Sequence, residues 1–383
     1  MLAIKAGKIE TMTEAGTLKD GVILIEDGRI KAIGADLEIP EEAEVYDYGE
    51  KTILPGLIDA HTHLGIGEEG IGWEGRDYNE MTSPVTPELR AIDAINPADL
   101  GLEDARKSGI TSVMVAPGSA NVIGGECLAM KTNGKYVDDM IIKNPVGIKA
   151  AFGENPKRVY GEQKKSPSTR MAVAAELRKA LMETEDYIKN KANKENDEDN
   201  SFKRDIQLES LARVINGEMP LKTHAHRADD IMTALRIADE FAIDLTIEHC
   251  TEGHKIAERL AEAGVPAIVG PSLTTRSKVE VKDRDFKTAA VLAEAGVKVA
   301  LMSDHPVIPV DNLMVYAALA VKAGLDRSEA YKSVTINPAE ILGINDRVGS
   351  LEAGKDADLV VYAGDPLDIA ANVEAVYISG EQI

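Results

Sequence analysis

The chain has 383 residues, of which 44% are hydrophobic and 28% charged, as is typical of a globular protein with a large core. Its 65 acidic residues outnumber the 43 basic ones and give a formal net charge of −22. Such a surface repels nucleic acid and anionic membranes, so we expect neither as a partner.

The cellular compartment is predicted from the cysteines and from the lack of long apolar segments. Cys127 and Cys250 are too few for a disulfide framework, which fits a reducing environment. The first residues lack the apolar stretch of a signal peptide, and no run approaches the roughly 18 apolar residues of a membrane helix. We therefore expect a cytoplasmic protein, and we expect it to form a homo-oligomer.

The two ends of the chain have the pattern of one small β-domain. Short apolar runs alternate with turns before residue 52, and Asp27-Gly28 between two of them predicts a hairpin. The strand-like runs are Ile4–Ile9, Gly21–Glu26, Arg29–Ile33, Val45–Asp47, Ala357–Tyr362 and Val373–Ile378. We expect residues 1–52 and 346–383 to form a small β-sandwich domain, with residues 53–345 inserted between them.

The middle of the chain alternates short apolar runs with helical patterns, which indicates parallel strands joined by crossover helices. The expected strands are Lys51–Asp59, Ile110–Ala116, Cys127–Lys131, Val146–Phe152, Leu221–His226, Asp244–Cys250, Pro266–Pro271 and Lys298–Ser303. Eight such units predict an α/β fold with a (β/α)₈ TIM-type barrel, although a doubly wound sheet shares the pattern.

Helical patterns separate several of these strands. They are Ala228–Phe241, Gly253–Ala263 and Phe286–Ala295. Residues 161–219 depart from the rhythm, and we expect two helices there, Thr169–Ile188 and Ile206–Ile215, around the polar run Lys189–Asn200. This insertion is either a decorated crossover, which we favour, or a lid or oligomer contact.

Histidines lie at the ends of the predicted strands. His61 and His63 follow the first barrel strand, and residues two apart in an extended chain point to the same side. Two imidazoles on one side can bind one metal ion, and the active sites of barrel enzymes lie at the carboxyl ends of the strands. A His-x-His pair alone is weak evidence of a metal site, and its placement makes the prediction much stronger.

Other potential ligands occupy equivalent places. His224 and His226 end the fifth expected strand, His249 ends the sixth, and Asp304 follows the eighth. Five of the seven histidines therefore fall at predicted strand ends. We interpret this group as a metal site at one end of a barrel.

Two segments resemble a known family, the amidohydrolase superfamily. Pro55–His63 is similar to its first-strand signature, and Thr335–Ala339 with Gly349–Leu359 is similar to its closing segment. The resemblance covers nearly the whole chain and is strongest to the imidazolonepropionase-related, cyclic amidase and dipeptidase branches. It implies that His61, His63, His224, His249 and Asp304 bind the metal.

The resemblance also implies the chemistry. One or two divalent metals, with Zn²⁺ as the expected ion, activate a water molecule, and Asp304 acts as general base and then as general acid. In the binuclear branches a carboxylated lysine on the fourth strand bridges the metals, and Lys149 matches that position. Glu154, at the end of the same strand, is the rival ligand; we favour Lys149. A third possibility is that Lys149 pairs with a buried acid and one metal binds.

Fewer residues point to the substrate. The family's deaminases usually carry a glutamate three residues after the fifth-strand histidine, where this chain has Arg227, so deamination is disfavoured. Arg158, Tyr160 and Arg227 follow strand ends, and these arginines either clamp a substrate carboxylate or are ordinary surface residues. His226 is expected to contact the substrate or to support the metal ligands.

We therefore predict a metal-dependent hydrolase that cleaves an amide or cyclic amide C–N bond of a small molecule. The alternatives are a non-catalytic homologue of the family, or a lactonase or phosphotriester hydrolase with the same metal site. All predicted ligand positions hold competent residues, which favours an enzyme.

Overall fold

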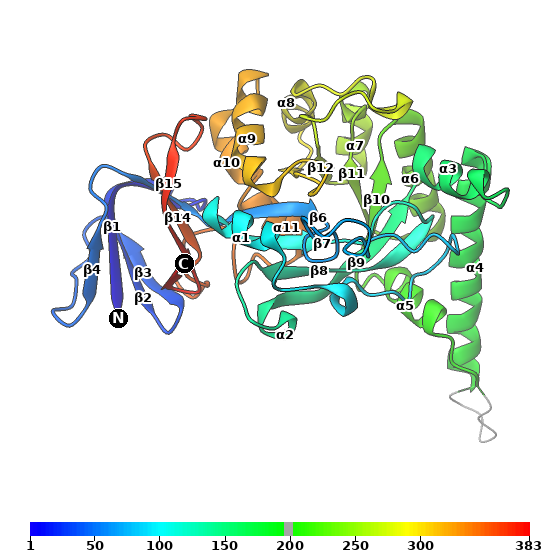
Figure 1. Ribbon diagram of the computed structural model, residues 1–383, viewed down its shortest axis with the longest axis horizontal. Helices are drawn as coiled ribbons and strands as arrows, with labels where there is room; N and C mark the ends of the chain where they lie inside the picture. The colour runs from blue at the N-terminus through cyan, green and yellow to red at the C-terminus, as the bar shows by residue number, and fades with distance from the viewer. Residues whose placement is uncertain (195–201) are drawn as a thin grey trace.

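The computed structural model describes residues 1–194 and 202–383. Two sheets of eight strands organise this part of the chain, one built from the two ends and one from the middle (Figure 1). In the view of Figure 1 the terminal sheet lies at one end of the molecule and α4 at the other.

The terminal sheet joins the first and last segments of the chain. Its strands are β1 (Leu2–Glu10), β2 (Thr17–Glu26), β3 (Arg29–Gly34), β4 (Glu44–Asp47), β5 (Thr52–Pro55), β14 (Leu359–Ala363), β15 (Asn372–Ile378) and β16 (Glu381–Gln382). β5 pairs with β1 on one side and with β14 on the other, so the two ends share one hydrogen-bonded sheet. The joint β-domain is present as a single connected sheet where we predicted a sandwich, and the domain limits at residues 52 and 346 stay a prediction.

The hairpin predicted at Asp27-Gly28 is confirmed. These two residues connect β2 to β3 and have φ values of 50° and 76°. Positive φ at both central positions is the mark of the two-residue turn that matches the twist of antiparallel strands.

The second sheet curves into a nearly closed barrel. Its strands are β6 (Leu57–Thr62), β7 (Ile110–Val115), β8 (Ile123–Lys131), β9 (Ile141–Ala151), β10 (Leu221–Ala225), β11 (Leu245–His249), β12 (Ala267–Val269) and β13 (Val299–Leu301). They lie side by side in chain order. At the open seam, the backbone N–H of Asp304 donates to the carbonyl of His61 (3.2 Å), and that of His63 donates to the carbonyl of His305 (2.9 Å). A TIM-type barrel is therefore the right description of the mixed α/β fold.

One strand of the barrel runs the wrong way for a regular (β/α)₈ fold. The third strand was expected to be parallel, but β8 is antiparallel to both β7 and β9. Only residues 116–122 connect β7 to β8, and a parallel connection needs a dozen or more residues. The short loop therefore forces a reversal of direction.

The first expected strand, Lys51–Asp59, is in fact two strands in different sheets. β5 pairs within the terminal sheet, and after Gly56 the chain enters the barrel as β6. A Cβ at residue 56 would lie 2.2 Å from Thr111 Oγ1, so only glycine allows this close approach. Gly56 therefore allows the chain to pass from β5 in the terminal sheet to β6 in the barrel.

Helices cover the barrel. They are α1 (Leu100–Lys107), α2 (Val137–Met140), α3 (Glu154–Glu162), α4 (Arg170–Lys194), α5 (Ile206–Ile215), α6 (Ala228–Phe241), α7 (Ala257–Ala263), α8 (Lys287–Glu294), α9 (Leu313–Lys322), α10 (Arg327–Lys332) and α11 (Ile336–Leu342), with 3₁₀ turns η1 (Ala91–Ala94), η2 (Gly253–Lys255), η3 (Val279–Val281) and η4 (Val310–Asn312). The predictions of α5 and α6 are confirmed with the same limits. The helix predicted at Gly253–Ala263 is divided into η2 and α7.

The insertion between β9 and β10 contains the two long helices that the pattern predicted. α4 begins at Arg170 and continues to Lys194, so the first part of the polar run is helical. The rest of that run, from residue 195, lies outside the described residues. Among the residues that are described, no helix is long and apolar enough to cross a membrane.

Candidate active site

Side chains from five barrel strands meet at one end of the barrel. They come from the ends of β6, β9, β10 and β11 and from the turn after β13, and all are buried. They are His61, His63, Lys149, His224, His226, His249 and Asp304. Because parallel strands present their carboxyl ends to the same face, strand order brings together residues that are far apart in sequence.

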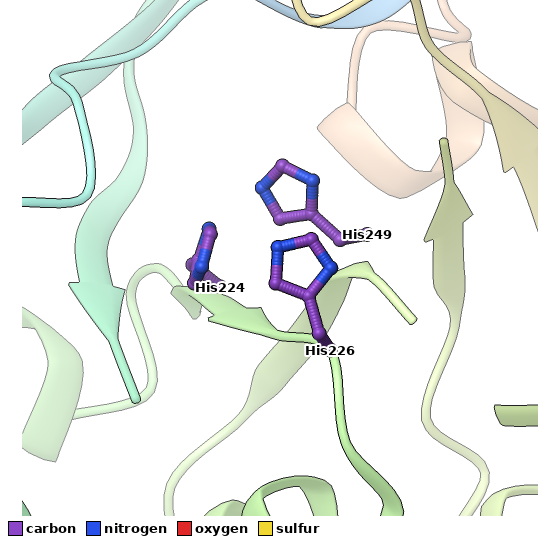
Figure 2. Close-up of side chains that lie close together, drawn as sticks. All are labelled: His224, His226 and His249. Carbon is purple, nitrogen blue, oxygen red and sulfur yellow. The ribbon is translucent and has the colours of Figure 1, made fainter. Parts of the chain in front are cut away.

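Two overlapping groups among them could hold a metal ion. His224, His226 and His249 form one, and His61, His249 and Asp304 form the other. Within each group the ligand atoms lie within 4.8 Å of one another. Figure 2 shows the first group, in which the three rings lie close together and their centroids are 4.2 to 4.7 Å apart. His249 belongs to both groups and therefore lies between two potential ion positions.

Hydrogen bonds hold three of these imidazoles with Nε2 directed inward. His63 Nδ1 contacts the carbonyl oxygen of Ala116 (2.6 Å), and His249 Nδ1 contacts that of Gly270 (3.0 Å). His61 Nδ1 contacts the Glu248 carboxylate at 2.7 Å. A carbonyl or carboxylate oxygen only accepts, so Nδ1 donates its proton in each case and Nε2 keeps a lone pair. This is the arrangement of histidines that bind metals through Nε2.

Three other imidazole nitrogens of this cluster are buried and have no hydrogen-bond partner among the described residues. These are both ring nitrogens of His224 and Nε2 of His226. Unpaired buried polar atoms are rare in proteins and call for an explanation such as an ion. Burial lowers the pKa of His224 to about 4 and that of His226 well below the ordinary value, so both rings are neutral at physiological pH. Neutral imidazole is the form that binds metals, so these residues fit a divalent cation.

Asp304 lies between the first two histidines. Its Oδ1 is 3.6 Å from His61 Nε2 and 3.5 Å from His63 Nε2. Burial alone would raise its pKa, but His63, His61 and Lys149 in their protonated forms outweigh burial and lower the pKa to about 2. Asp304 also has φ = 57°, a conformation that non-glycine residues rarely adopt and that often occurs at functional sites.

The two rival bridging residues have different surroundings. Lys149 is 1% exposed, and its Nζ lies 3.0 Å from His61 Nε2. Burial lowers the pKa of this lysine, which favours the neutral amine. Glu154 begins α3; its backbone N–H donates to Glu280 Oε2 (2.9 Å), and its side chain belongs to neither ligand group. The geometry thus supports Lys149.

A cavity of about 350 Å³ opens onto this cluster. His63, His224, His226, His249 and Asp304 line it. Tyr78 also lines it, and its ring stacks on that of His63 with centroids 5.2 Å apart. The site therefore has room for a small molecule directly beside the potential ligands.

Three predicted substrate contacts do not line this cavity. Arg158 is exposed on α3, and Arg227 pairs with Asp229 at the surface (2.7 Å). The buried Tyr160 donates its hydroxyl to the carbonyl of Ser83 (2.6 Å). The geometry therefore does not support substrate contacts for these residues, because their positions along α3 and just before α6 place them away from the cavity.

Comparison with known proteins decides the family. The sequence model of the amidohydrolase family matches residues 52–383. The chain belongs to the amidohydrolase family. It is therefore a hydrolase that acts on C–N bonds, in a family that is generally metal-dependent.

Two named proteins and one crystal structure are similar to this amidohydrolase. The amidohydrolase tasK of Hapsidospora irregularis is 29% identical over 387 residues, and the match covers 94% of this chain but 39% of tasK. An imidazolonepropionase of Geobacillus sp. (strain WCH70) is 26% identical, over 97% of this chain and 89% of its own. The crystal structure of an amidohydrolase from Thermotoga maritima MSB8 superimposes with a TM-score of 0.97 at 45% identity, covering 100% of this chain and 99% of the other.

Sequence reasoning missed two carboxylates of this amidohydrolase site. Glu248 interrupts the apolar strand β11, a signal as clear as Lys149 in β9, and could have been found in the same way. Glu280 lies in η3, on a loop without periodicity, and no pattern marked it. Its Oε1 is 3.7 Å from His226 Nε2 and 3.9 Å from His224 Nε2.

Proposed function

We propose that this amidohydrolase cleaves an amide or cyclic amide bond of a small molecule with the help of a divalent metal, with Asp304 as the proton carrier. The observation that carries the proposal is the set of imidazoles whose Nδ1 atoms are fixed by acceptors while Nε2 points to Asp304 and the cavity. Such a donor set serves no evident purpose in packing.

The residues that would hold zinc are those gathered at the strand ends. They are His61, His63, His224, His249 and Asp304, with Lys149 as a carbamate in a site for two ions. When bound, a divalent metal lowers the pKa of water from 15.7 to around 7 and polarises a carbonyl oxygen. His226 lines the cavity beside His224 and His249, and we keep it as a substrate contact, with metal binding in the first group as its alternative role.

The chain's own residues account for the proton transfers. Asp304 is ionised at neutral pH, because its pKa is about 2, and its Oδ1 faces the imidazoles at the cavity wall. It takes a proton from the attacking water and delivers it to the departing nitrogen, which completes hydrolysis without net proton uptake by the protein. The His63 ring is held by the hydrogen bond of its Nδ1 to the carbonyl oxygen of Ala116 and by stacking on the Tyr78 ring.

Lys149 is the better candidate for the bridge. A lysine reacts with carbon dioxide only as the neutral amine, and burial in β9 favours that form. The resulting carbamate would convert an isolated buried amine, which is costly, into an anion beside metal ions.

The proposal is tested by a hydrolysis screen that compares the wild-type protein with Asp304→Asn. The panel contains cyclic amides, dipeptides and N-acyl amino acids, with lactones and phosphotriesters as alternative substrates. We expect amide hydrolysis that falls about 10²–10⁴-fold in the variant, the usual contribution of a general base, while much of the metal content is kept. Undiminished turnover by Asp304→Asn, or turnover of lactones or phosphotriesters alone, would contradict the proposal.

A further inference from the structure

Four charged side chains line the cavity, and they are Lys278, Arg284, Asp285 and Asp304. Lys278 Nζ pairs with Glu280 Oε1 at 2.8 Å, and Asp285 pairs with Lys287 at 3.4 Å. Asp304 faces the imidazoles described above. Arg284 also lines the cavity, but within residues 1–194 and 202–383 it forms no ion pair.

Arg284 is nevertheless held in place. Its Nη1 donates to the carbonyl oxygen of Ser272 at 2.9 Å, which fixes the guanidinium against the loop after β12. Its Nε is buried and has no hydrogen-bond partner in the part of the chain that the structure describes. A guanidinium has five N–H donors, so most of its capacity remains for another partner.

A partly buried cation without a counter-ion is unfavourable unless something else supplies the negative charge. The cavity that Arg284 faces is the one that also holds His224, His249 and Asp304. The missing counter-charge is therefore explained if a substrate brings it into the cavity.

We propose that Arg284 binds a carboxylate of the substrate and thereby selects small amides that carry one negative charge. This inference rests on the proposed function, which supplies the amide. A planar carboxylate matches the guanidinium fork with two parallel hydrogen bonds. A phosphate dianion is disfavoured, because the wall offers one uncompensated cation and the second charge would stay unpaired. Substrates of this class include N-acyl amino acids, dipeptides and carboxylated cyclic amides.

The test uses matched pairs of ligands in which a carboxylate is replaced by a carboxamide. The panel pairs N-acetyl amino acids, dipeptides and pyroglutamate-type cyclic amides with their primary amides. Hydrolysis is measured as kcat and KM on the wild-type protein, and binding is measured by calorimetry on Asp304→Asn, so that substrate is not consumed. We expect the kcat/KM of the wild-type protein to be about 10- to 100-fold higher for the carboxylate than for its amide. A charge-assisted hydrogen-bonded pair contributes a difference of this size.

Variants of two arginines on the same loop isolate the contribution of Arg284 to the carboxylate preference. Arg284→Met should abolish the preference, mostly through a higher KM, and Arg284→Lys should restore part of it. Arg276→Met is the matched control, since Arg276 is exposed, does not line the cavity and donates to the carbonyl of Lys282. This control should leave the preference unchanged.

The outcomes separate this inference from the proposed function. Carboxylate binding that depends on Arg284 in the absence of any hydrolysis would support the inference and contradict the function. Amide hydrolysis without a carboxylate preference in any pair, or a preference that survives Arg284→Met, would overturn the inference and leave the function standing.

Discussion

Glu248 and His61 form a buried pair under the metal-ligand cluster, with Oε2 and Nδ1 2.7 Å apart and both side chains fully buried. Thr246 donates its hydroxyl to the other carboxylate oxygen of Glu248 at 2.6 Å. The pair fixes the His61 tautomer, with the proton on Nδ1 and the lone pair on Nε2.

Replacing Glu248 with Gln should weaken the site without removing a ligand. The amide is a poorer acceptor and carries no charge, so His61 Nε2 becomes less basic. We expect zinc affinity to fall about 10- to 100-fold in competition with a chelator, as is usual for such supporting residues. Glu262→Gln is the control, because Glu262 pairs with Arg259 on the surface of α7. Equal affinities of wild type and Glu248→Gln would show that the pair is only structural.

Two buried lysines on neighbouring strands offer a matched test of the carbamate. Lys149 on β9 and Lys222 on β10 are register partners, and both are buried. Only Lys149 contacts His61. We expect Lys149→Met to lower the metal content from about two ions per chain to one or none and to make it independent of bicarbonate. Lys222→Met should keep the wild-type content, and equal losses in the two variants would argue against the carbamate.

A buried ion-pair cluster ties the barrel to the C-terminal segment. Lys131 on β8 contacts both Asp356, at 3.1 Å, and Asp358, and all three side chains are buried. Removing one partner of a buried pair leaves uncompensated charge and costs about 3–5 kcal/mol. We expect Lys131→Met to lower the free energy of unfolding in urea by this amount. The exposed pair of Lys107 with Glu103 is the comparison, and Lys107→Met should change the free energy of unfolding by less than about 1 kcal/mol.

The same cluster predicts a dependence of stability on acid. Burial alone would raise the pKa of Asp356, but Lys131 and Arg347 outweigh it and hold the pKa below 3.8. The unfolded chain therefore binds this proton first as pH falls, so the contribution of Asp356 is complete above about pH 4 and declines below it. The free energy of unfolding of wild type should approach that of Asp356→Asn between pH 4 and pH 2. A constant difference over that range would contradict the pKa shift.

The sequence predicts which side chains meet at the end of the barrel, because barrel strands impose a simple rule. Residues at the carboxyl ends of successive strands meet in space, so His61, His224, His249 and Asp304 could be grouped before their distances were known. The family resemblance then named their roles. The same rule failed for β8, because strand direction depends on the length of the connecting loop and the loop at 116–122 is too short for a crossover.

The substrate side of the cavity was not predictable in this way. Arg158 and Arg227 follow strand ends, as active-site residues do, but Arg158 on α3 and Arg227 just before α6 lie toward the surface. Glu280 and Arg284 lie in the loop between β12 and α8, where neither helical nor strand periodicity indicates which side chains face the cavity. The left-handed backbone at His249 (φ = 69°) and Asp304 also has no sequence signature.

The most direct test is a zinc titration of metal-depleted protein, in which elemental analysis and amide hydrolysis are measured on the same samples. We expect no turnover at the start and a rise in proportion to bound zinc until one or two ions per chain are reached, with two if Lys149 is carboxylated in bicarbonate. Full turnover in the metal-free protein, or no metal bound after reconstitution, would contradict this expectation.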